Sequence, residues 1–279
     1  MADFASLPSL RDVADAHGFR ARRSLGQNFL FDENLLDRIA RIASDLSDTH
    51  VIEIGPGPGG LTRALLRAGA HSVTAIDKDR RCRDALADLI AVSDGRLHFV
   101  EADAMEVDVE SLGNSPFVVV GNLPFNIATE LLMRLVVRNT RIDRMVLMFQ
   151  KEVGERIAAQ PGTRSYGRLS VIVQWLCQAE TCFEVPARAF VPPPKVSASV
   201  LRIAPRAEPL APAPEVSLKA VTAAAFGQRR KTLRNSLKSA FPDPVAALEA
   251  AGIKPEVRAE TVGIEDFCAL AREHAMQIG

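Results

Sequence analysis

The chain has 279 residues, of which 47% are hydrophobic and 24% charged, and its 34 basic and 34 acidic side chains give no net charge. Because these fractions are average for globular proteins, they argue against a disordered, collagenous or membrane-spanning chain, and the length favours two domains. The neutral total removes the simplest argument for a nucleic-acid partner, so such an argument must depend on local clusters of charge.

Cysteine usage and the N-terminal sequence indicate the compartment. The four cysteines show neither paired spacing nor histidines at metal-ligand spacing, so we expect reduced thiols, no disulfide framework and no metal. These cysteines are Cys82, Cys177, Cys182 and Cys268. No apolar run approaches the roughly 20 residues of a membrane-spanning helix. The first residues lack the basic start and apolar centre of a secretory signal, so the expected location is cytoplasmic.

Short runs of branched apolar residues alternate with helical patterns through the first part of the chain. The predicted strands are 51–54, 72–76, 97–100, 117–120 and 145–149, and the predicted helices are 61–68, 80–92, 127–137, 152–159 and 169–177. Nearly uninterrupted apolar strands are typical of a sheet that is covered on both faces. The alternation therefore predicts an α/β fold with a doubly wound, mostly parallel sheet, whose ligands bind at the carboxyl ends of the strands.

The composition changes near residue 205. A strand predicted over 196–203 follows three prolines, so we expect it at or near an edge of the sheet. A segment rich in proline and alanine, 206–215, is typical of a linker. Helical patterns then follow over 217–226, 228–240, 245–251 and 264–276. The predicted boundaries are therefore a first domain over 1–205, a linker over 206–215 and a small all-helical domain over 216–279.

A glycine-rich segment, EIGPGPGG over residues 53–60, follows the first predicted strand. Gly55 and Gly57 allow the backbone to turn sharply and to approach a ligand closely before a helix begins. Asp77 ends the second strand 22 residues after Gly55, near the offset at which an acidic side chain binds ribose hydroxyls. The segment therefore indicates a site for a nucleoside-containing ligand.

Two prolines in this segment, Pro56 and Pro58, have no amide hydrogens, although such hydrogens hold a pyrophosphate at a helix start. S-adenosylmethionine has a ribose and an adenine but no phosphate, so the segment favours this methyl donor over a dinucleotide. A tight turn with a purely structural role is the third interpretation. Asp103 follows the third strand and could accept a hydrogen bond from the adenine amine of the donor, or it could cap the following turn.

The segment GNLPFN, residues 121–126, follows the fourth predicted strand. The side-chain oxygen of Asn122 and the backbone carbonyl of Leu123 or Pro124 can accept the two hydrogen bonds of an adenine amine. Phe125 offers a ring on which the base can stack, worth about 1–3 kcal/mol. Positioning opposite a cationic sulfur can then carry methyl transfer. A rigid proline turn with a buried phenylalanine is the alternative, but the place beside the predicted crevice favours the catalytic interpretation.

Eight segments that span nearly the whole chain together resemble the small-subunit ribosomal RNA adenine dimethyltransferase family. They are residues 22–30, 53–62, 101–104, 121–132, 166–171, 190–200, 228–237 and 258–261. The resemblance implies a class I methyltransferase fold that moves four methyl groups from S-adenosylmethionine to two adjacent adenosines in a hairpin near the 3′ end of small-subunit rRNA. The implied partner is rRNA within a pre-assembled small ribosomal subunit, with no membrane, and the expected state is a monomer.

The resemblance also implies roles for individual residues. The target base would be received by Asn122, Leu123, Pro124 and Phe125. The cofactor would be bound by Gln27, Asn28, Leu30, Gly55, Gly57, Asp77, Asp103 and Asn122. Two departures matter, because the family more often has tyrosine at Phe125 and glutamate at Asp77. Phe125 lacks the tyrosine hydroxyl but can still stack on the base. Asp77 is one methylene shorter than glutamate, so its carboxylate has a shorter reach to the ribose.

Basic residues cluster in two places that could contact RNA. The predicted RNA-binding residues are Arg22, Arg23, Arg229, Arg230, Lys231, Arg234 and Lys238. On the predicted helix 228–240, Arg230, Arg234 and Lys238 follow i, i+4, i+8 spacing and would share one stripe. A solvated helix face is the alternative. We therefore predict an S-adenosylmethionine-binding catalytic domain over 1–205 and an RNA-binding helical domain over 216–279.

The residues alone leave two other functions and the role of Tyr166 open. A protein with this fold could bind nucleic acid as an assembly or transcription factor without transferring methyl groups, although such a factor has no need of both the glycine turn and the GNLPF loop. A dehydrogenase is opposed by Pro56 and Pro58. Tyr166, in a polar loop, could border the active site or be an ordinary loop residue. RNA rather than DNA, and double rather than single methylation, depend on the resemblance.

Overall fold

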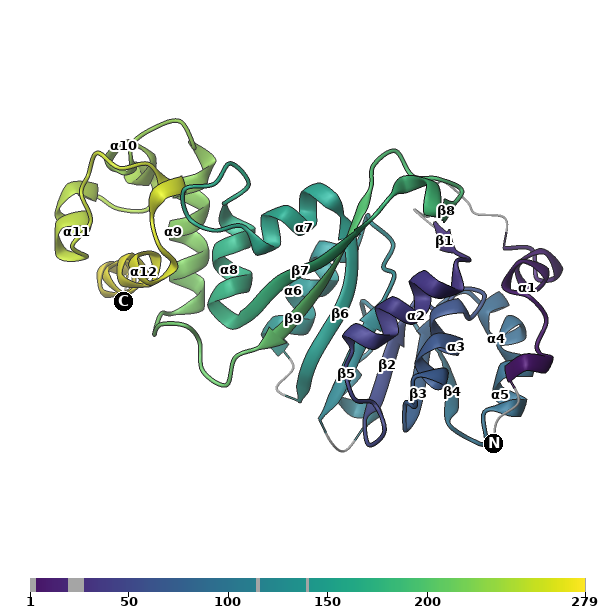
Figure 1. The fold of residues 1–279 in the computed structure, drawn as a ribbon. Coiled ribbons are helices and arrows are strands. Elements are labelled where there is room, and N and C mark those ends of the chain that lie inside the picture. Colours follow the sequence, from purple (N-terminus) through teal and green to yellow (C-terminus); the bar gives the residue numbers. More distant parts are fainter. Residues whose placement is uncertain (1–3, 20–27, 114–115, 139–140, 279) are drawn as a thin grey trace. The chain divides into compact units, whose positions relative to one another are not determined.

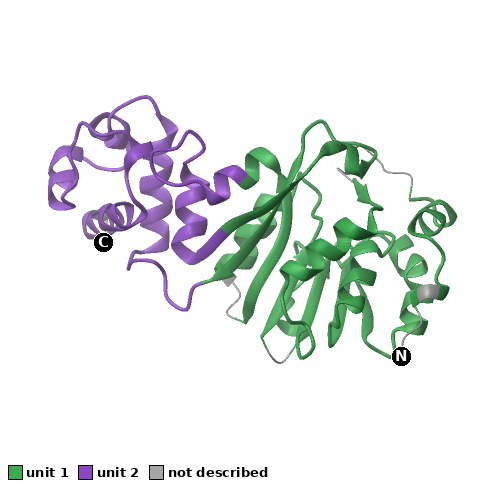
Figure 2. Ribbon diagram, viewed as in Figure 1, with its two compact units in different colours: residues 1–154, 180–205 green, residues 155–179, 206–279 purple. Residues whose placement is uncertain are grey.

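The computed structural model describes residues 4–19, 28–113, 116–138 and 141–278 (Figure 1). The chain forms two compact units, one from residues 1–154 and 180–205 and the other from residues 155–179 and 206–279 (Figure 2). In this division residues 155–179 belong to the second unit, whereas the predicted first domain ran to residue 205 without interruption. The assignment of a function to each domain stays a prediction.

Within the described residues, a seven-stranded sheet has the order β4-β3-β2-β5-β6-β9-β7. The strands are β2 (His50–Ile54), β3 (Ser72–Asp77), β4 (Leu97–Glu101), β5 (Phe117–Gly121), β6 (Ile142–Gln150), β7 (Cys177–Val185) and β9 (Ala198–Pro205). Strands β2 to β6 pair in parallel, and β9 pairs antiparallel with β6. The predicted doubly wound, mostly parallel sheet is confirmed, and its five predicted parallel strands are all present.

The antiparallel end of the sheet differs in detail from the prediction. Strand β9 begins at Ala198, after the three prolines, and lies one place inside the edge because β7 lies outside it. Strand β7 was not predicted. A separate two-stranded ribbon pairs β1 (Phe29–Leu30) with β8 (Phe190–Val191) and so joins the N-terminal segment to the loop before β9.

Helices cover both faces of the sheet. In Figure 1, α2 and α3 lie in front of the strands and α6 lies behind them, as right-handed crossovers in opposite directions from β2 require. The helices of this part are α1 (Leu10–Ala16), α2 (Glu33–Ile42), α3 (Gly60–Arg67), α4 (Arg81–Ala85), α5 (Ala87–Val92), α6 (Ala128–Arg138) and α7 (Lys151–Ala158). The single helix predicted over 80–92 is two helices, because the ψ angle of −5° at Leu86 interrupts it.

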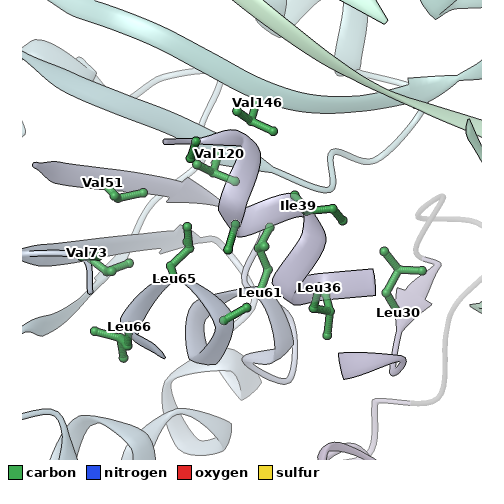
Figure 3. Packing of buried hydrophobic residues seen from close by; sticks show 14 of the residues in the cluster. Leu30, Leu36, Ile39, Val51, Leu61, Leu65, Leu66, Val73, Val120 and Val146 are labelled. Atoms are coloured by element: carbon green, nitrogen blue, oxygen red, sulfur yellow. The ribbon is translucent and has the colours of Figure 1, made fainter. Parts of the chain in front are cut away.

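The main hydrophobic core lies between α2, α3 and the centre of the sheet. Leu61 and Leu65 of α3 pack with Val51, Val73 and Val120, the apolar strand residues (Figure 3). Each of these side chains is at most 6% exposed, and full burial of a valine or leucine contributes about 1.5–3 kcal/mol. This packing holds β2, β3 and β5 together beneath α3.

The second unit is helical. It contains α8 (Arg168–Leu176), α9 (Glu215–Gly227), α10 (Leu233–Ser236), α11 (Pro244–Ala250) and α12 (Ile264–Ile278). Segment 206–215 packs in this unit, since the Leu210 amide and the Ala211 carbonyl bond to Trp175 at 2.8 Å each. Tyr166 is fully buried, and its hydroxyl donates to the Val262 carbonyl at 3.0 Å. Tyr166 therefore lies in a loop, as predicted, and its side chain belongs to the core of this unit.

The helix predicted over 228–240 is also wrong. Residues 228–231 form a turn, Thr232 is extended and pairs with Arg258, and helix begins only at Leu233. Among the described residues, no helix is long and apolar enough to cross a membrane, and no group of three or more potential ligand side chains is arranged to hold a metal ion.

Candidate functional site

The loop between β2 and α3 has the conformation that its glycines permit. Gly55, Gly57 and Gly59 all have positive φ angles, of 76°, 53° and 88°. A Cβ atom at Gly57 would lie 3.0 Å from the ring of Phe29, so a larger residue there meets both backbone strain and a close neighbour. The glycines therefore bring the loop backbone close to the N-terminal segment that carries Phe29.

A cleft opens at the carboxyl ends of β2, β3 and β5. The predicted site residues around it are Asn28, Gly55, Gly57, Asp77, Asn122, Leu123, Pro124 and Phe125, and Phe19, Phe29 and Cys82 complete the lining. Leu30 lines an adjoining, more apolar cavity that also touches Gly55 and Asn122. The structure thus brings together four chain segments, with residues 19 and 28–29, 55–57, 77–82 and 122–125, at the strand ends where a doubly wound sheet places its ligand site.

Asn122 has a fixed orientation in this cleft. Its side-chain Nδ2 donates a hydrogen bond of 2.9 Å to the backbone carbonyl of Asn28. Because a carbonyl can only accept, this contact determines which end of the amide is nitrogen. The Oδ1 atom of Asn122 is consequently directed away from Asn28 and remains the acceptor of the side chain.

Of the next three residues, Leu123 and Pro124 offer backbone carbonyls as acceptors, and Phe125 packs through its ring. The Pro124 carbonyl already accepts bonds of 3.1 Å from the amides of Ile127 and Ala128, which begin α6. Both of its lone pairs are therefore used. Of the two carbonyls that the sequence suggested, that of Leu123 is the better placed acceptor, while the Leu123 side chain is only 2% exposed. Phe125 is half-buried and packs against the edge of the main core.

Asp77 closes the cleft at the end of β3. Its Oδ1 accepts the amide of Asp79 at 2.9 Å, and burial raises its pKa, an effect that hydrogen bonds from Asp79 and the Cys82 thiol partly oppose. Burial and the neighbouring Asp77 also raise the pKa of Cys82. Cys82 is therefore held as a neutral thiol that donates to Asp77, and it is no nucleophile.

Asp103 has partners outside the cleft. Its carboxylate accepts the Met105 amide at 2.9 Å and the Lys78 ammonium at 3.0 Å, and these contacts lower its pKa, the amide contributing most. The turn-cap interpretation is thus confirmed. Asp103 does not line the described cleft, and its predicted contact with the cofactor adenine stays a prediction.

Glu53 is a further residue whose importance the sequence did not show. It is fully buried in β2 before the glycine turn, and within the described part of the chain neither of its carboxyl oxygens has a hydrogen-bond partner. Burial raises its pKa to about 8, and the neighbouring Thr62 opposes the shift only in part. Glu53 is therefore protonated at neutral pH. Its one visible signal was an acidic residue inside an otherwise apolar strand.

The predicted RNA-binding residues do not form one helical stripe. Arg230 lies in the turn before α10, whereas Arg234 and Lys238 lie in α10 and the short 3-10 helix after it, η5 (Leu237–Ser239). All of these, and Lys231, are exposed. Arg229 is less available for RNA, because it forms a 3.0 Å ion pair with Glu260. Arg22, Arg23 and Gln27, also predicted site residues, lie outside the described residues.

Comparisons with known proteins agree with this arrangement. The family model described as ribosomal RNA adenine dimethylase matches residues 18–276. The ribosomal RNA small subunit methyltransferase A of Rhodospirillum rubrum is 58% identical over 95% of this chain and 92% of its own length. The protein of the same name from Dinoroseobacter shibae is 49% identical over 99% of each chain.

Two solved structures share the fold. A dimethyladenosine transferase from Plasmodium falciparum has a TM-score of 0.75 at 26% identity, covering 89% of this chain and 98% of its own. The 23S rRNA methyltransferase ErmE has a TM-score of 0.70 at 27% identity, covering 89% of this chain and all of its own. Both similarities extend over most of the chain.

Proposed function

The chain belongs to the ribosomal RNA adenine dimethylase family, and from this premise we propose how its cleft presents an adenine for methylation. The protein is an rRNA adenine dimethyltransferase that uses S-adenosylmethionine as the methyl donor. The proposed substrate is a pair of adjacent adenosines in the 3′-terminal hairpin of small-subunit rRNA, within a pre-assembled small ribosomal subunit. We further propose that the enzyme acts as a monomer in the cytoplasm.

The residues present fit this methyl donor. S-adenosylmethionine supplies a methyl group on a cationic sulfur together with a ribose and an adenine. The cleft offers the Asp77 carboxylate for ribose hydroxyls and has the aromatic rings of Phe19 and Phe29 in its lining, and aromatic rings attract cations. Asn28, Leu30, Gly55 and Gly57 surround the remaining space. Asp103 is held by Lys78 and the Met105 amide beside the cleft, and its carboxylate has acceptor capacity left for the adenine amine.

One observation carries the catalytic proposal, namely the bond from Asn122 Nδ2 to the Asn28 carbonyl. It leaves Asn122 Oδ1 and the Leu123 carbonyl to accept the two N–H bonds of an adenine amine. Accepting both bonds draws the amine nitrogen out of conjugation with the ring, so its lone pair can attack. The same acceptors stabilise the positive charge that develops on this nitrogen during transfer. Phe125 holds the base by stacking.

The geometry favours an enzyme over a factor that only binds nucleic acid. A binding protein would need neither an amide fixed in one orientation nor an adjoining cleft suited to a methyl donor. The family match also replaces the dehydrogenase interpretation, because every relative described above is a methyltransferase.

The test is incubation of the protein with methyl-labelled S-adenosylmethionine and small ribosomal subunits that lack these methyl groups. Mapping of the modified bases should find dimethyladenosine at two adjacent positions near the 3′ end of the rRNA. Label at a single position, or at a distant one, would contradict the proposed substrate. Free rRNA serves as the comparison, since a pre-assembled subunit should be the better substrate.

A further inference from the structure

A partly buried ion pair connects two loops of the helical unit. Arg229 Nε donates to Glu260 Oε2 at 3.0 Å, and the two side chains are 37% and 32% exposed. The same guanidinium donates through Nη2 to the Arg164 carbonyl at 2.6 Å and lies 3.4 Å from the Thr163 carbonyl. Arg229 therefore uses two faces of its guanidinium to hold two different segments.

A third contact closes the arrangement. The Gly162 amide donates to the Glu260 carbonyl at 2.7 Å, so loop 160–166 is bound to segment 258–262 by backbone as well as by Arg229. Segment 228–232 joins the same group, since Thr232 pairs with Arg258. Three segments that are distant in the sequence are thereby fixed side by side within one unit.

The basic residues on these segments fall into two classes. Arg164, Arg230 and Lys231 are exposed, and in the part of the chain that the structure describes none of them has a carboxylate within 4.0 Å. Arg229 already has its charge compensated by Glu260. The printed bonds use Nε and Nη2 of Arg229, so a phosphate would meet its Nη1 edge and a charge that Glu260 already compensates.

We propose that Arg164, Arg230 and Lys231 form one RNA-contact surface and that Arg229 with Glu260 is the positioning pair that assembles it. The proposal rests on the proposed function, and it changes the predicted role of Arg229 from an RNA contact to a residue that acts through its neighbours. An array fixed before binding loses less conformational freedom when it meets phosphates. Arginine suits this position because its planar guanidinium can donate in two directions, which a lysine ammonium does with less fixed geometry.

The two roles of Arg229 predict opposite effects of removing Glu260. If Arg229 contacts phosphate, Glu260→Ala frees its charge and removes a repelling carboxylate, so rRNA binding should become tighter and more dependent on salt. If Arg229 positions the loops, Glu260→Ala should weaken binding although it makes the surface more positive. Glu256→Ala is the matched control, because Glu256 forms a long, exposed ion pair with Arg234, at 3.9 Å, and is not a partner of Arg229.

The experiment measures the affinity of unmethylated small ribosomal subunits at several salt concentrations, together with KM and kcat for methyl transfer. We expect Glu260→Ala and Arg229→Ala to raise Kd and KM about tenfold, with kcat and cofactor affinity unchanged. Glu260→Gln keeps an acceptor oxygen and should restore most of the binding. Arg164→Ala should reduce the salt slope by about one, as expected for the loss of one phosphate contact.

The variant Arg229→Lys is a second test of the positioning role of Arg229, and it leaves Glu260 unchanged. This variant keeps the charge but cannot hold Glu260 and the Arg164 carbonyl in the same geometry, so we expect binding as weak as in Arg229→Ala. Wild-type affinity for Arg229→Lys, or tighter binding by Glu260→Ala, would overturn the proposal. Failure of the wild-type protein to methylate the subunits would instead refute the proposed function.

Discussion

The side chain of Asn122, directly after β5, is hydrogen-bonded at 2.9 Å to the backbone carbonyl of Asn28, a residue 94 positions earlier in the chain. The contact couples the proposed catalytic loop to the segment that leads into β1. It also makes the orientation of the Asn122 amide a property of the fold. The proposed acceptor geometry therefore depends on the N-terminal segment as well as on the loop itself.

Asn122→Asp should abolish most methyl transfer. The substitution replaces the Nδ2 donor with an oxygen that faces the Asn28 carbonyl, so the two acceptors repel and the side chain turns away. We expect the single-turnover rate to fall about 10²-fold or more, while affinity for the cofactor, measured by calorimetry, changes little. Asn34→Asp, an exposed position in α2, is the control. A rate near that of the wild type would exclude Asn122 as an acceptor for the adenine.

Phe125→Leu should weaken the hold on the target base. Leucine keeps the packing against the core but loses the ring, and base stacking on an aromatic ring is worth about 1–3 kcal/mol. We expect kcat/KM for small ribosomal subunits to fall about tenfold. Phe125→Tyr keeps the ring and should retain activity. Equal losses in the leucine and tyrosine variants would show that packing, and not stacking, sets the role of this position.

Glu53 should make stability depend on pH. Its pKa is about 8 in the folded protein and 4.5 as a reference, so between these values the unfolded state releases a proton that the folded state retains. The stabilising contribution is therefore complete below about pH 4.5 and is lost as the pH rises toward 8. We expect the free energy of unfolding to fall by up to ~1.4 kcal/mol per pH unit within this window.

Urea unfolding of the wild type and Glu53→Gln between pH 5 and pH 8.5 checks this expectation. The amide cannot ionise, so the stability of the variant relative to the wild type should increase steadily with pH. Glu106→Gln, which changes an exposed carboxylate, should show no such trend. A constant difference between wild type and Glu53→Gln across the range would mean that Glu53 is not buried as a neutral acid.

Gly121→Ala should disturb the loop through a backbone contact. An added Cβ would lie 2.8 Å from the Ile54 carbonyl of β2 and 2.9 Å from a Leu123 methyl group. The two strands must separate slightly, at a cost of about 1–3 kcal/mol, and Asn122 moves with them. Gly227→Ala, where an added Cβ meets nothing within 4 Å, should leave thermal stability and activity unchanged. Wild-type stability of the Gly121 variant would contradict the close packing.

The parallel part of the fold could be predicted because its strands are almost purely apolar. The run Val118, Val119 and Val120 has one physical solution, a strand buried on both faces. Strand β7 escaped prediction since Gln178, Glu180 and Glu184 interrupt its pattern, as suits the exposed edge that it occupies. Local charge spacing also suggested a helix through Thr232, but a pairing with Arg258, distant in the sequence, holds that residue extended.

Motifs predicted where the site lies, because strand ends in a doubly wound sheet converge. They could not predict which groups in it already have partners. The choice between the carbonyls of Leu123 and Pro124 depends on the start of α6, and the role proposed for Arg229 depends on Glu260, a partner from another segment. Such pairings are formed by tertiary folding and leave no local pattern.

The chain passes from the first unit to the second after residue 154, returns at 180 and leaves again after 205. Exchange of the helical module between relatives therefore requires three splice points in the gene, at 154/155, 179/180 and 205/206. A cut at the proline-rich linker alone would deprive the Trp175 indole of the Ala211 carbonyl and the Tyr166 hydroxyl of the Val262 carbonyl. Recombination in this lineage is thus constrained by how the polypeptide is threaded.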